Sequence, residues 1–482
     1  MDVVKVMRNN SFPSLVRFLV RHRRLRHGAM RLIEEKIDQI IVDGNPDNRP
    51  EQVQKDKVAH LTAILHSFDR AIERGLISRR VLDRSVETLL DNVFCWGDVC
   101  REAECRLGCR PPLFVLVSPD KRCNLRCSGC YACSDAASAA KLDWATFDRI
   151  LTEKEELWGS YFTVISGGEP FLWESDGKDL LDMVGRHRSN FFMVYTNGTL
   201  ITKAVAGRLA EVGNITPAIS VEGFGAETDQ RRGKGVHRRI LQAMENLREV
   251  GVPFGISVTA TRHNTDIVMS DEFADFYFDR QGAIYGWIFQ YMPIGRKHTL
   301  DLMVSPEQRL EMWRRTRHLV LDRKIFVADF WNSGTTSGGC IAAGREGGYL
   351  YINWDGDVTP CAFIPYSTMN INDIYRRGGN LDDVLKCPLF TRIRRWQDEY
   401  GYAQPAEKTG NWLCPCAIRD HFGEFLDATR DCRARPIDDE AAEALGDPDY
   451  HCGMISYGED YDRLSGDIWN ERYLLKKMAH AI

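Results

Sequence analysis

The sequence predicts an α/β protein whose centre is a partial, TIM-like barrel of six β/α units. Its strongest indication is a series of six short apolar runs, at residues 113–117, 161–165, 191–195, 215–220, 254–260 and 286–292. Amphipathic helical patterns lie between these runs, for example at 143–159, 203–213 and 236–252. Parallel strands need long crossover connections, so this alternation favours a parallel sheet with helices outside. Six units favour a partial barrel over a closed one of eight strands.

The N-terminal region, residues 1–110, is predicted to be helical. The segment 14–41 has apolar residues at helical spacing, and its arginines cluster in the first half. The segment 58–75 repeats the pattern and ends at Gly75, a suitable C-cap, and Ser78 is a candidate N-cap for the next helix. The basic segment is interpreted as a solvated helix face or, alternatively, as a membrane-surface helix that binds anionic lipid.

The C-terminal region, residues 326–482, is predicted to be a loop-rich, cysteine-containing domain. Residues 347–363 predict a hairpin that turns at Asp355 and Gly356. A last helix is expected near 470–479. Since the remainder shows little apolar periodicity, we expect metal to hold it together. The predicted domains are therefore 1–110, 111–325 and 326–482, the middle one being the barrel.

Size, charge and cysteine content narrow the function classes. The 482-residue chain has a net charge of −5, which disfavours a general nucleic-acid binder. No apolar run approaches bilayer-spanning length and no signal-peptide pattern opens the chain, so a cytoplasmic protein is expected, with peripheral membrane contact as an alternative. In a reducing compartment, the fifteen cysteines favour metal ligands over disulfides.

Four of these cysteines lie in the stretch KRCNLRCSGCYAC, residues 121–133, directly after the first predicted strand. Cys123, Cys127 and Cys130 form the pattern C-x3-C-x2-C, which can surround one compact centre. A cubane iron–sulfur cluster bound by three thiolates keeps one iron free for a small chelating molecule. Structural zinc is the alternative, but it usually has four protein ligands. Cys133 is either a fourth ligand or a spectator thiol.

Short polar and glycine-rich sequences follow four of the other strands. They are SGGEP at 166–170, TNGT at 196–199, SVEG at 220–223 and PIGR at 293–296. One such sequence alone is usually a turn. Each one here lies at the C-terminal end of its strand, where barrel folds build active sites. Together with the cysteine loop they predict one site.

This combination resembles the radical S-adenosylmethionine (radical SAM) superfamily over residues 112–300. The resemblance implies a [4Fe–4S] cluster on Cys123, Cys127 and Cys130. It also implies binding residues for S-adenosylmethionine: Gly167, Gly168 and Glu169 at the amino group, Ser220 and Arg232 at the carboxylate, and Tyr131 at the adenine. The implied reaction is reductive cleavage to a 5′-deoxyadenosyl radical that abstracts hydrogen from an unactivated C–H bond. A reductant such as flavodoxin or ferredoxin is then required.

Seven further cysteines resemble, in part, a SPASM-type auxiliary-cluster domain, and imply at least one auxiliary [4Fe–4S] cluster. Gly356-x4-Cys361 and the CPC sequence at 414–416 carry this resemblance, but the usual tight cysteine array is missing. Asp420 is a possible non-cysteine ligand, and scattered structural thiols are the alternative. The proposed auxiliary ligands are Cys340, Cys361, Cys387, Cys414, Cys416, Cys432 and Cys452. A separate group is either a metal site or a set of thiols at the barrel's edge: Cys95, Cys100, Cys105 and Cys109.

The substrate is predicted only by class. The basic N-terminal segment motivates a hypothesis of lipid-chain modification. Relatives with auxiliary-cluster domains often modify ribosomal peptides, so a peptide substrate is the main alternative. An iron–sulfur electron-transfer or cluster-carrier protein is the alternative function, but it gives no role to SGGEP or to RRGKG, residues 231–235, which contains Arg232. A zinc-stabilised interaction protein is a further alternative. The sequence assigns no catalytic residue, although Tyr291 and the C-terminal thiols are possible hydrogen donors.

Overall fold

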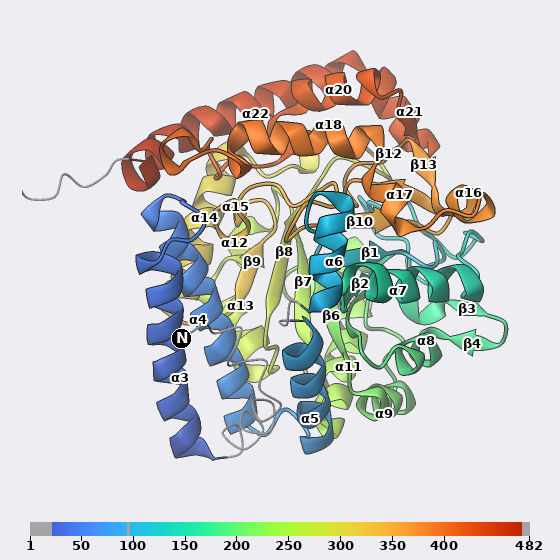
Figure 1. Ribbon diagram of the computed structural model, residues 1–482. Coiled ribbons are helices and arrows are strands. Elements are labelled where there is room, and N and C mark those ends of the chain that lie inside the picture. The colour runs from blue at the N-terminus through green and yellow to red at the C-terminus, as the bar shows by residue number, and fades with distance from the viewer. Residues whose placement is uncertain (1–21, 94–96, 475–482) are drawn as a thin grey trace, which may run out of the picture.

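The computed structural model describes residues 22–93 and 97–474. A ten-stranded, mainly parallel sheet forms the centre of the protein (Figure 1), in the order β13-β11-β10-β1-β2-β5-β6-β7-β8-β9. Its strands in chain order are β1 (Phe114–Val117), β2 (Phe162–Ile165), β5 (Phe191–Thr196), β6 (Ile215–Val221), β7 (Gly255–Ala260), β8 (Gly286–Gln290), β9 (Val327–Asp329), β10 (Tyr349–Ile352), β11 (Asp357–Thr359) and β13 (Met369–Asn370). All six predicted strands are present and parallel, so the α/β partial barrel is confirmed.

The helices between the strands also follow the predicted pattern. They are α7 (Trp144–Trp158), α8 (Leu180–Arg186), α9 (Lys203–Val212), α10 (Gly225–Arg232), α11 (Val236–Val250), α12 (Thr265–Val268), α13 (Asp271–Ala274) and α14 (Pro306–Leu321). The side chain of Asp143 caps α7 by accepting a hydrogen bond from the Thr146 N–H, and the helix ends at Gly159. Because strands such as β5 are buried almost throughout, they read as continuous apolar runs.

Two parallel strands beyond the predicted six extend the barrel. β9 pairs with β8, and β10 pairs with β1, with Phe114 beside Tyr349. The predicted hairpin is confirmed, since β10 and β11 are antiparallel and joined through Gly356. The sheet therefore continues across the predicted boundary at residues 325 and 326, and the domain limits remain predictions. Two small antiparallel pairs complete the strands: the hairpin of β3 (Glu174–Ser175) with β4 (Lys178–Asp179), and the long-range pair of β12 (Tyr366–Ser367) with β14 (Arg435–Pro436).

The described part of the N-terminal region is helical, as predicted. Its helices are α3 (Arg23–Asp38), α4 (Glu51–Glu73), α5 (Arg79–Thr88) and α6 (Asp98–Leu107). Ser78 is the N-cap of α5, although its side chain makes no capping hydrogen bond. Arg26 is buried and pairs with Asp69 and Glu73 of α4, so acids of α4 neutralise part of the basic face. The first basic residues of the segment, Arg17 and Arg21, lie outside the described residues. Among the described helices, none is long and apolar enough to cross a membrane.

The C-terminal region is more helical than the sequence patterns predict. Its helices are α15 (Gly334–Ser337), α16 (Ile371–Arg376), α17 (Leu381–Leu385), α18 (Pro388–Gln397), α19 (Ala417–Asp420), α20 (Phe422–Asp431), α21 (Asp439–Gly446) and α22 (Pro448–Trp469). α18, α20 and α22 form a layer over one end of the sheet (Figure 1). Buried Phe390, Phe425 and Met454 give this layer an apolar core. The expectation of a region with little core of its own was therefore wrong, because its helices bury their apolar side chains jointly.

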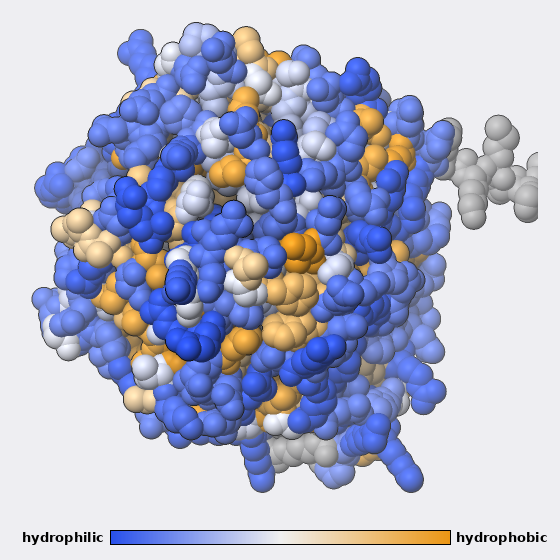
Figure 2. All heavy atoms as spheres, turned by 180° about the vertical axis from the view of Figure 1, so that it is seen from behind, coloured by the Kyte–Doolittle hydropathy of each residue, from blue (hydrophilic) through white to orange (hydrophobic). Residues whose placement is uncertain are grey.

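The opposite face of the protein is mainly hydrophilic, with apolar side chains gathered near its middle (Figure 2). The large apolar residues that are most exposed among the described ones include Leu25, Leu32 and Ile33 of α3. The structure describes the predicted last helix at 470–479 only as far as Leu474. Its described part, Asn470–Leu474, is a π-helical turn that continues α22.

Candidate functional site

The loop between β1 and α7 brings Cys123, Cys127 and Cys130 to one cavity of about 260 Å³. The ends of β2, β5, β6 and β8 also contribute to its wall, as the strand-end sequences predict. Cys123 is only 8% exposed, and burial, with the neighbouring Glu169 and the other two thiols, raises the pKa of its thiol to about 12. Binding of a metal centre would therefore release a proton from this cysteine.

The three thiols of this loop line one cavity and form an all-sulfur donor set. Within residues 22–93 and 97–474, no three cysteine sulfurs lie within 4.8 Å of one another. Sulfur ligands on one tetrahedral zinc would lie only about 3.8 Å apart, because each Zn–S bond is about 2.3 Å. A cubane cluster separates its ligands by more than that, since each thiolate binds a different iron. Three thiolate donors on one cavity are a donor set that suits an iron–sulfur cluster with one open iron.

Glycines bring two strand-end sequences against the backbone of the cysteine loop. A Cβ atom on Gly168 would lie 2.2 Å from the Arg122 carbonyl oxygen, and one on Gly295 would lie 2.3 Å from that of Tyr131. The N–H groups of Gly168 and Glu169 donate to the Asp120 and Arg122 carbonyls, at 2.9 Å each. Only glycine permits this close approach, so SGGEP and PIGR fix the path of the cysteine loop.

Three arginines surround the same loop. Arg296 of PIGR donates to the Cys127 carbonyl at 2.8 Å and to the Ser134 carbonyl at 2.6 Å. Arg231 donates to the Ser128 carbonyl at 3.1 Å, and both Arg231 and Arg232 pair with buried Glu222. Sequence analysis proposed Arg232 but missed Arg231, Glu222 and Arg296. Their position in the already recognised SVEG, RRGKG and PIGR sequences was the available indication.

Most predicted contacts of S-adenosylmethionine line this cavity: Tyr131, Gly167, Gly168, Ser220 and Arg232. Glu169 lies behind the wall. Its carboxylate accepts hydrogen bonds from the Thr196 hydroxyl at 2.7 Å and the Asn197 N–H at 2.8 Å, and burial raises its pKa to about 7. Glu169 thus joins SGGEP to TNGT, and its contact with the amino group remains a prediction.

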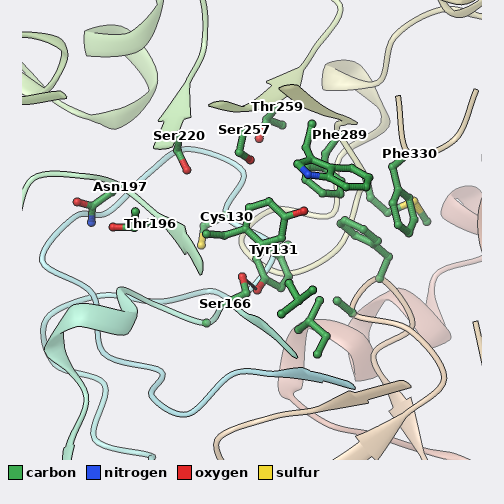
Figure 3. Close-up of a pocket in the computed structure, with 18 of the residues that line it drawn as sticks. Cys130, Tyr131, Ser166, Thr196, Asn197, Ser220, Ser257, Thr259, Phe289 and Phe330 are labelled. Carbon is green, nitrogen blue, oxygen red and sulfur yellow. Dashed lines mark hydrogen bonds between the residues drawn. The ribbon is translucent and has the colours of Figure 1, made fainter. Parts of the chain in front are cut away.

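The cavity has a polar end and an aromatic end (Figure 3). Cys130, Asn197 and Ser220 lie at one end, Phe289 and Phe330 lie at the other, and Tyr131 lies between them. The Tyr131 hydroxyl is 2.8 Å from the Ser166 hydroxyl, which holds the ring across the cavity. The polar end suits the charged groups of a small cosubstrate, and the aromatic end suits an apolar group.

Tyr291 lines the cavity, but its hydroxyl donates to the Lys297 carbonyl at 2.6 Å. Burial raises the pKa of Tyr291 to about 12. Cys133 does not line this cavity. Its thiol donates to the Glu440 carboxylate at 2.8 Å, which favours the spectator interpretation over a fourth ligand.

A second cavity, of about 380 Å³, is lined by Cys340, Cys361 and Cys416. Burial raises the pKa of the Cys416 thiol, and Asp420, Cys340 and Cys361 nearby raise it further. The Tyr349 hydroxyl lies 2.9 Å from the Cys361 sulfur, within hydrogen-bond distance. The N-terminal helix α4 closes one side of this cavity with Lys57 and His60. Three neighbouring thiols at one cavity form a donor set that suits an auxiliary cluster.

The remaining predicted auxiliary ligands do not line the second cavity. Cys414 is fully buried among Trp412 and its neighbours, Cys387 lies close to Cys432, and Cys452 is exposed on α22. Asp420 is also unsuited to metal binding. Its two carboxylate oxygens accept hydrogen bonds from buried Arg309, and one of them also accepts from the Cys416 N–H.

The N-terminal cysteine group is not gathered in the described structure. Cys100 is buried on α6, whereas Cys105 and Cys109 are exposed, and Cys95 lies outside the described residues.

This geometry defines a class of protein, namely an enzyme that couples iron–sulfur clusters to S-adenosylmethionine. The family model of the radical SAM superfamily matches residues 117–271 of this chain. The model of the SPASM iron–sulfur cluster-binding domain matches residues 340–417. The chain is 31% identical to the mycofactocin maturase MftC of Mycobacterium ulcerans over 301 residues, covering 60% of this chain and 79% of that protein. The chain therefore belongs to the radical SAM superfamily and carries a SPASM domain. It binds a [4Fe–4S] cluster, S-adenosylmethionine and an auxiliary iron–sulfur cluster.

The chain is also similar to two other proteins. The Fe-coproporphyrin III synthase of Methanosarcina barkeri is 31% identical over 212 residues, covering 43% of this chain and 51% of that protein. The crystal structure of Streptococcus suis SuiB has a similar fold, with a TM-score of 0.50 and 16% identity, covering 70% of this chain and 83% of SuiB. These similarities concern the family and the fold of the chain, and they do not identify its substrate.

Proposed function

We propose that the protein abstracts hydrogen from a C–H bond of an apolar side chain in a peptide substrate. The observation that carries this proposal is that three thiols, a polar end and an aromatic end line one and the same cavity. A substrate carbon at the aromatic end would then lie next to the cosubstrate. The bound cluster and S-adenosylmethionine would supply the 5′-deoxyadenosyl radical for this step.

The residues of this chain would hold and orient the reactants. In this proposal, Cys123, Cys127 and Cys130 bind the first cluster. The backbone of Gly167 and Gly168, together with Ser220 and Arg232, binds the amino acid portion of S-adenosylmethionine, and Tyr131 flanks the adenine. The aromatic wall would exclude water and stray hydrogen donors from the radical.

The contacts at the aromatic end support a largely uncharged substrate group. Trp287, Phe289, Phe330 and Phe363 line it, and Gln290 contributes an amide oxygen that is buried without a hydrogen-bond partner. Such a pocket would accept an aromatic or branched aliphatic side chain, and the Gln290 oxygen would accept a hydrogen bond from an N–H of the substrate. A peptide provides both groups.

A peptide is favoured over a lipid by two observations. Part of the basic face of α3 is paired with acids of α4, which reduces its attraction to an anionic membrane. The relative MftC is named a maturase, and SuiB has been crystallised with a precursor peptide. We therefore propose a peptide, with lipid as the alternative that the substrate experiment tests.

The experiment for the reaction is anaerobic reconstitution with iron and sulfide, reduction with dithionite, and measurement of 5′-deoxyadenosine. We expect wild-type protein to release it, and Cys123→Ala, Cys127→Ala and Cys130→Ala to lose release by at least 100-fold. Cys452→Ala is the matched control, because Cys452 is exposed on α22. Release by the three variants at the wild-type rate would contradict the proposal, and an electron-transfer or carrier protein would release none.

The substrate class is tested with peptides that each carry one deuterated apolar residue, alongside anionic vesicles with deuterated acyl chains. We expect deuterium in 5′-deoxyadenosine from a peptide with an aromatic or branched side chain. Transfer only from the vesicles would refute the peptide proposal while leaving the radical chemistry intact.

A further inference from the structure

The second cavity contains a buried ligand atom that the cysteine pattern does not include. His60 of α4 lines this cavity together with Cys340, Cys361 and Cys416. Its Nε2 atom is buried and has no hydrogen-bond partner. Burying a polar atom without a hydrogen-bond partner costs folding free energy, which a bound metal centre at Nε2 would offset.

The other ring nitrogen fixes the protonation of His60. Nδ1 lies 2.9 Å from the Asp56 carbonyl oxygen, and 3.1 Å from the Thr336 hydroxyl. Since a carbonyl oxygen only accepts hydrogen bonds, Nδ1 carries the proton and Nε2 presents its lone pair. Histidines that bind metals typically donate the other N–H to a carbonyl in this way, which fixes the ring's orientation.

Other polar groups at this cavity are less suitable as a fourth ligand. Asp329 is hydrogen-bonded through both oxygens to Gln290. Lys57 is an ammonium donor whose charge lies near Asp47. Cys414, although close in sequence to Cys416, does not line the cavity. Among the described residues at this cavity, His60 combines a free lone pair with a fixed ring.

We propose that Nε2 of His60 is the fourth protein ligand of the auxiliary cluster, beside Cys340, Cys361 and Cys416. The inference rests on the proposed role of these three cysteines. It gives the N-terminal region a direct function, since α4 would complete a cluster site whose other ligands follow residue 339. A neutral imidazole in place of a fourth thiolate makes the cluster less negative, which raises its reduction potential.

The test uses the full-length chain with Cys123→Ala, Cys127→Ala and Cys130→Ala, so that the first cluster does not contribute to the spectra. After reconstitution and reduction, pulsed electron paramagnetic resonance measures coupling between the cluster and ¹⁴N. We expect an imidazole nitrogen coupling that changes when histidine is labelled with ¹⁵N. In this background, His60→Ala is expected to lose the coupling completely and to convert a large part of the cluster to a [3Fe–4S] form.

The matched control is His66→Ala on the same helix, because the His66 ring pairs with Glu34. It is expected to keep the coupling. His60→Cys supplies a thiolate instead, so we expect retained iron, no nitrogen coupling and a more negative reduction potential. Iron retained by His60→Ala itself, in part as the [3Fe–4S] form, shows that its loss of coupling does not reflect failed folding.

Two results would overturn the assignment of His60 without affecting the proposed auxiliary cluster. One is an iron-loaded parent chain, with only the three cysteine substitutions, that shows no nitrogen coupling. The other is a coupling that persists in His60→Ala. An unchanged potential in His60→Cys would also count against this assignment. A parent chain that retains no iron would refute the proposed auxiliary cluster itself, and the two failures are therefore distinguishable by iron content.

Discussion

Substitution of Gly168 by alanine tests whether close backbone contact holds the cysteine loop. The added Cβ would lie 2.2 Å from the Arg122 carbonyl oxygen and 2.5 Å from that of Lys121. These atoms belong to the backbone, so the loop that leads into Cys123 must move. Overpacking costs about 1–3 kcal/mol, and loss of a backbone hydrogen bond adds about 1 kcal/mol. A total near 3 kcal/mol corresponds to roughly a 100-fold loss of the loop conformation that binds the cluster.

The assays for Gly168→Ala are iron and sulfide content after reconstitution, release of 5′-deoxyadenosine, and thermal unfolding. We expect a marked loss of the first two and a smaller change in unfolding, because the strain is confined to one loop. Gly207→Ala on α9 is the matched control, since its Cβ would meet no atom within 4 Å and alanine favours a helix. If Gly168→Ala behaved like Gly207→Ala, the proposed role of the glycine contact would be refuted.

Three further predictions concern other parts of the protein. Arg296→Lys should reduce cluster retention several-fold, because one ammonium cannot reproduce both guanidinium contacts; equal iron content in both proteins would contradict this. Burial lowers the pKa of Lys154 to about 7, so the unfolded chain binds an extra proton between pH 7 and 10.5. The free energy of unfolding should rise across that range by at most about 5 kcal/mol, and Lys154→Met should remove the rise in denaturant titrations at each pH. Tyr349→Phe should make the auxiliary cluster's reduction potential more negative, because a hydrogen bond to the Cys361 sulfur is lost; redox titration showing no shift would argue against that contact at the cluster.

The strands and the cysteine loop could be predicted because their information is local. Each apolar run at 113–117 or 191–195 is long enough for one buried strand, and the alternation with helices requires parallel pairing. The three cysteines of the C-x3-C-x2-C pattern that begins at Cys123 lie within one loop, so their spacing can be read directly from the sequence. The strand-end sequences could be assigned to one rim because parallel strands present their C-terminal ends on the same side.

The auxiliary site was only partly predictable. Seven cysteines were proposed from a partial resemblance to a SPASM-type domain, and the structure gathers Cys340, Cys361 and Cys416 at one cavity while Cys452 is exposed. The helical C-terminal layer was missed because the apolar faces of its helices become evident only when they pack on one another. The position of β10 beside β1 was likewise missed, since more than two hundred residues separate the two strands.

The sequence alone therefore predicted the class of the protein and its partial barrel, and it proposed the first set of cluster ligands. Only the tertiary structure decided which distant groups share a cavity. His60, in a helix that reads as ordinary amphipathic structure, lies with Cys340 although 280 residues separate them. Local spacing can specify ligands that fall within one loop, but ligands from separate elements are brought together by packing of the whole chain.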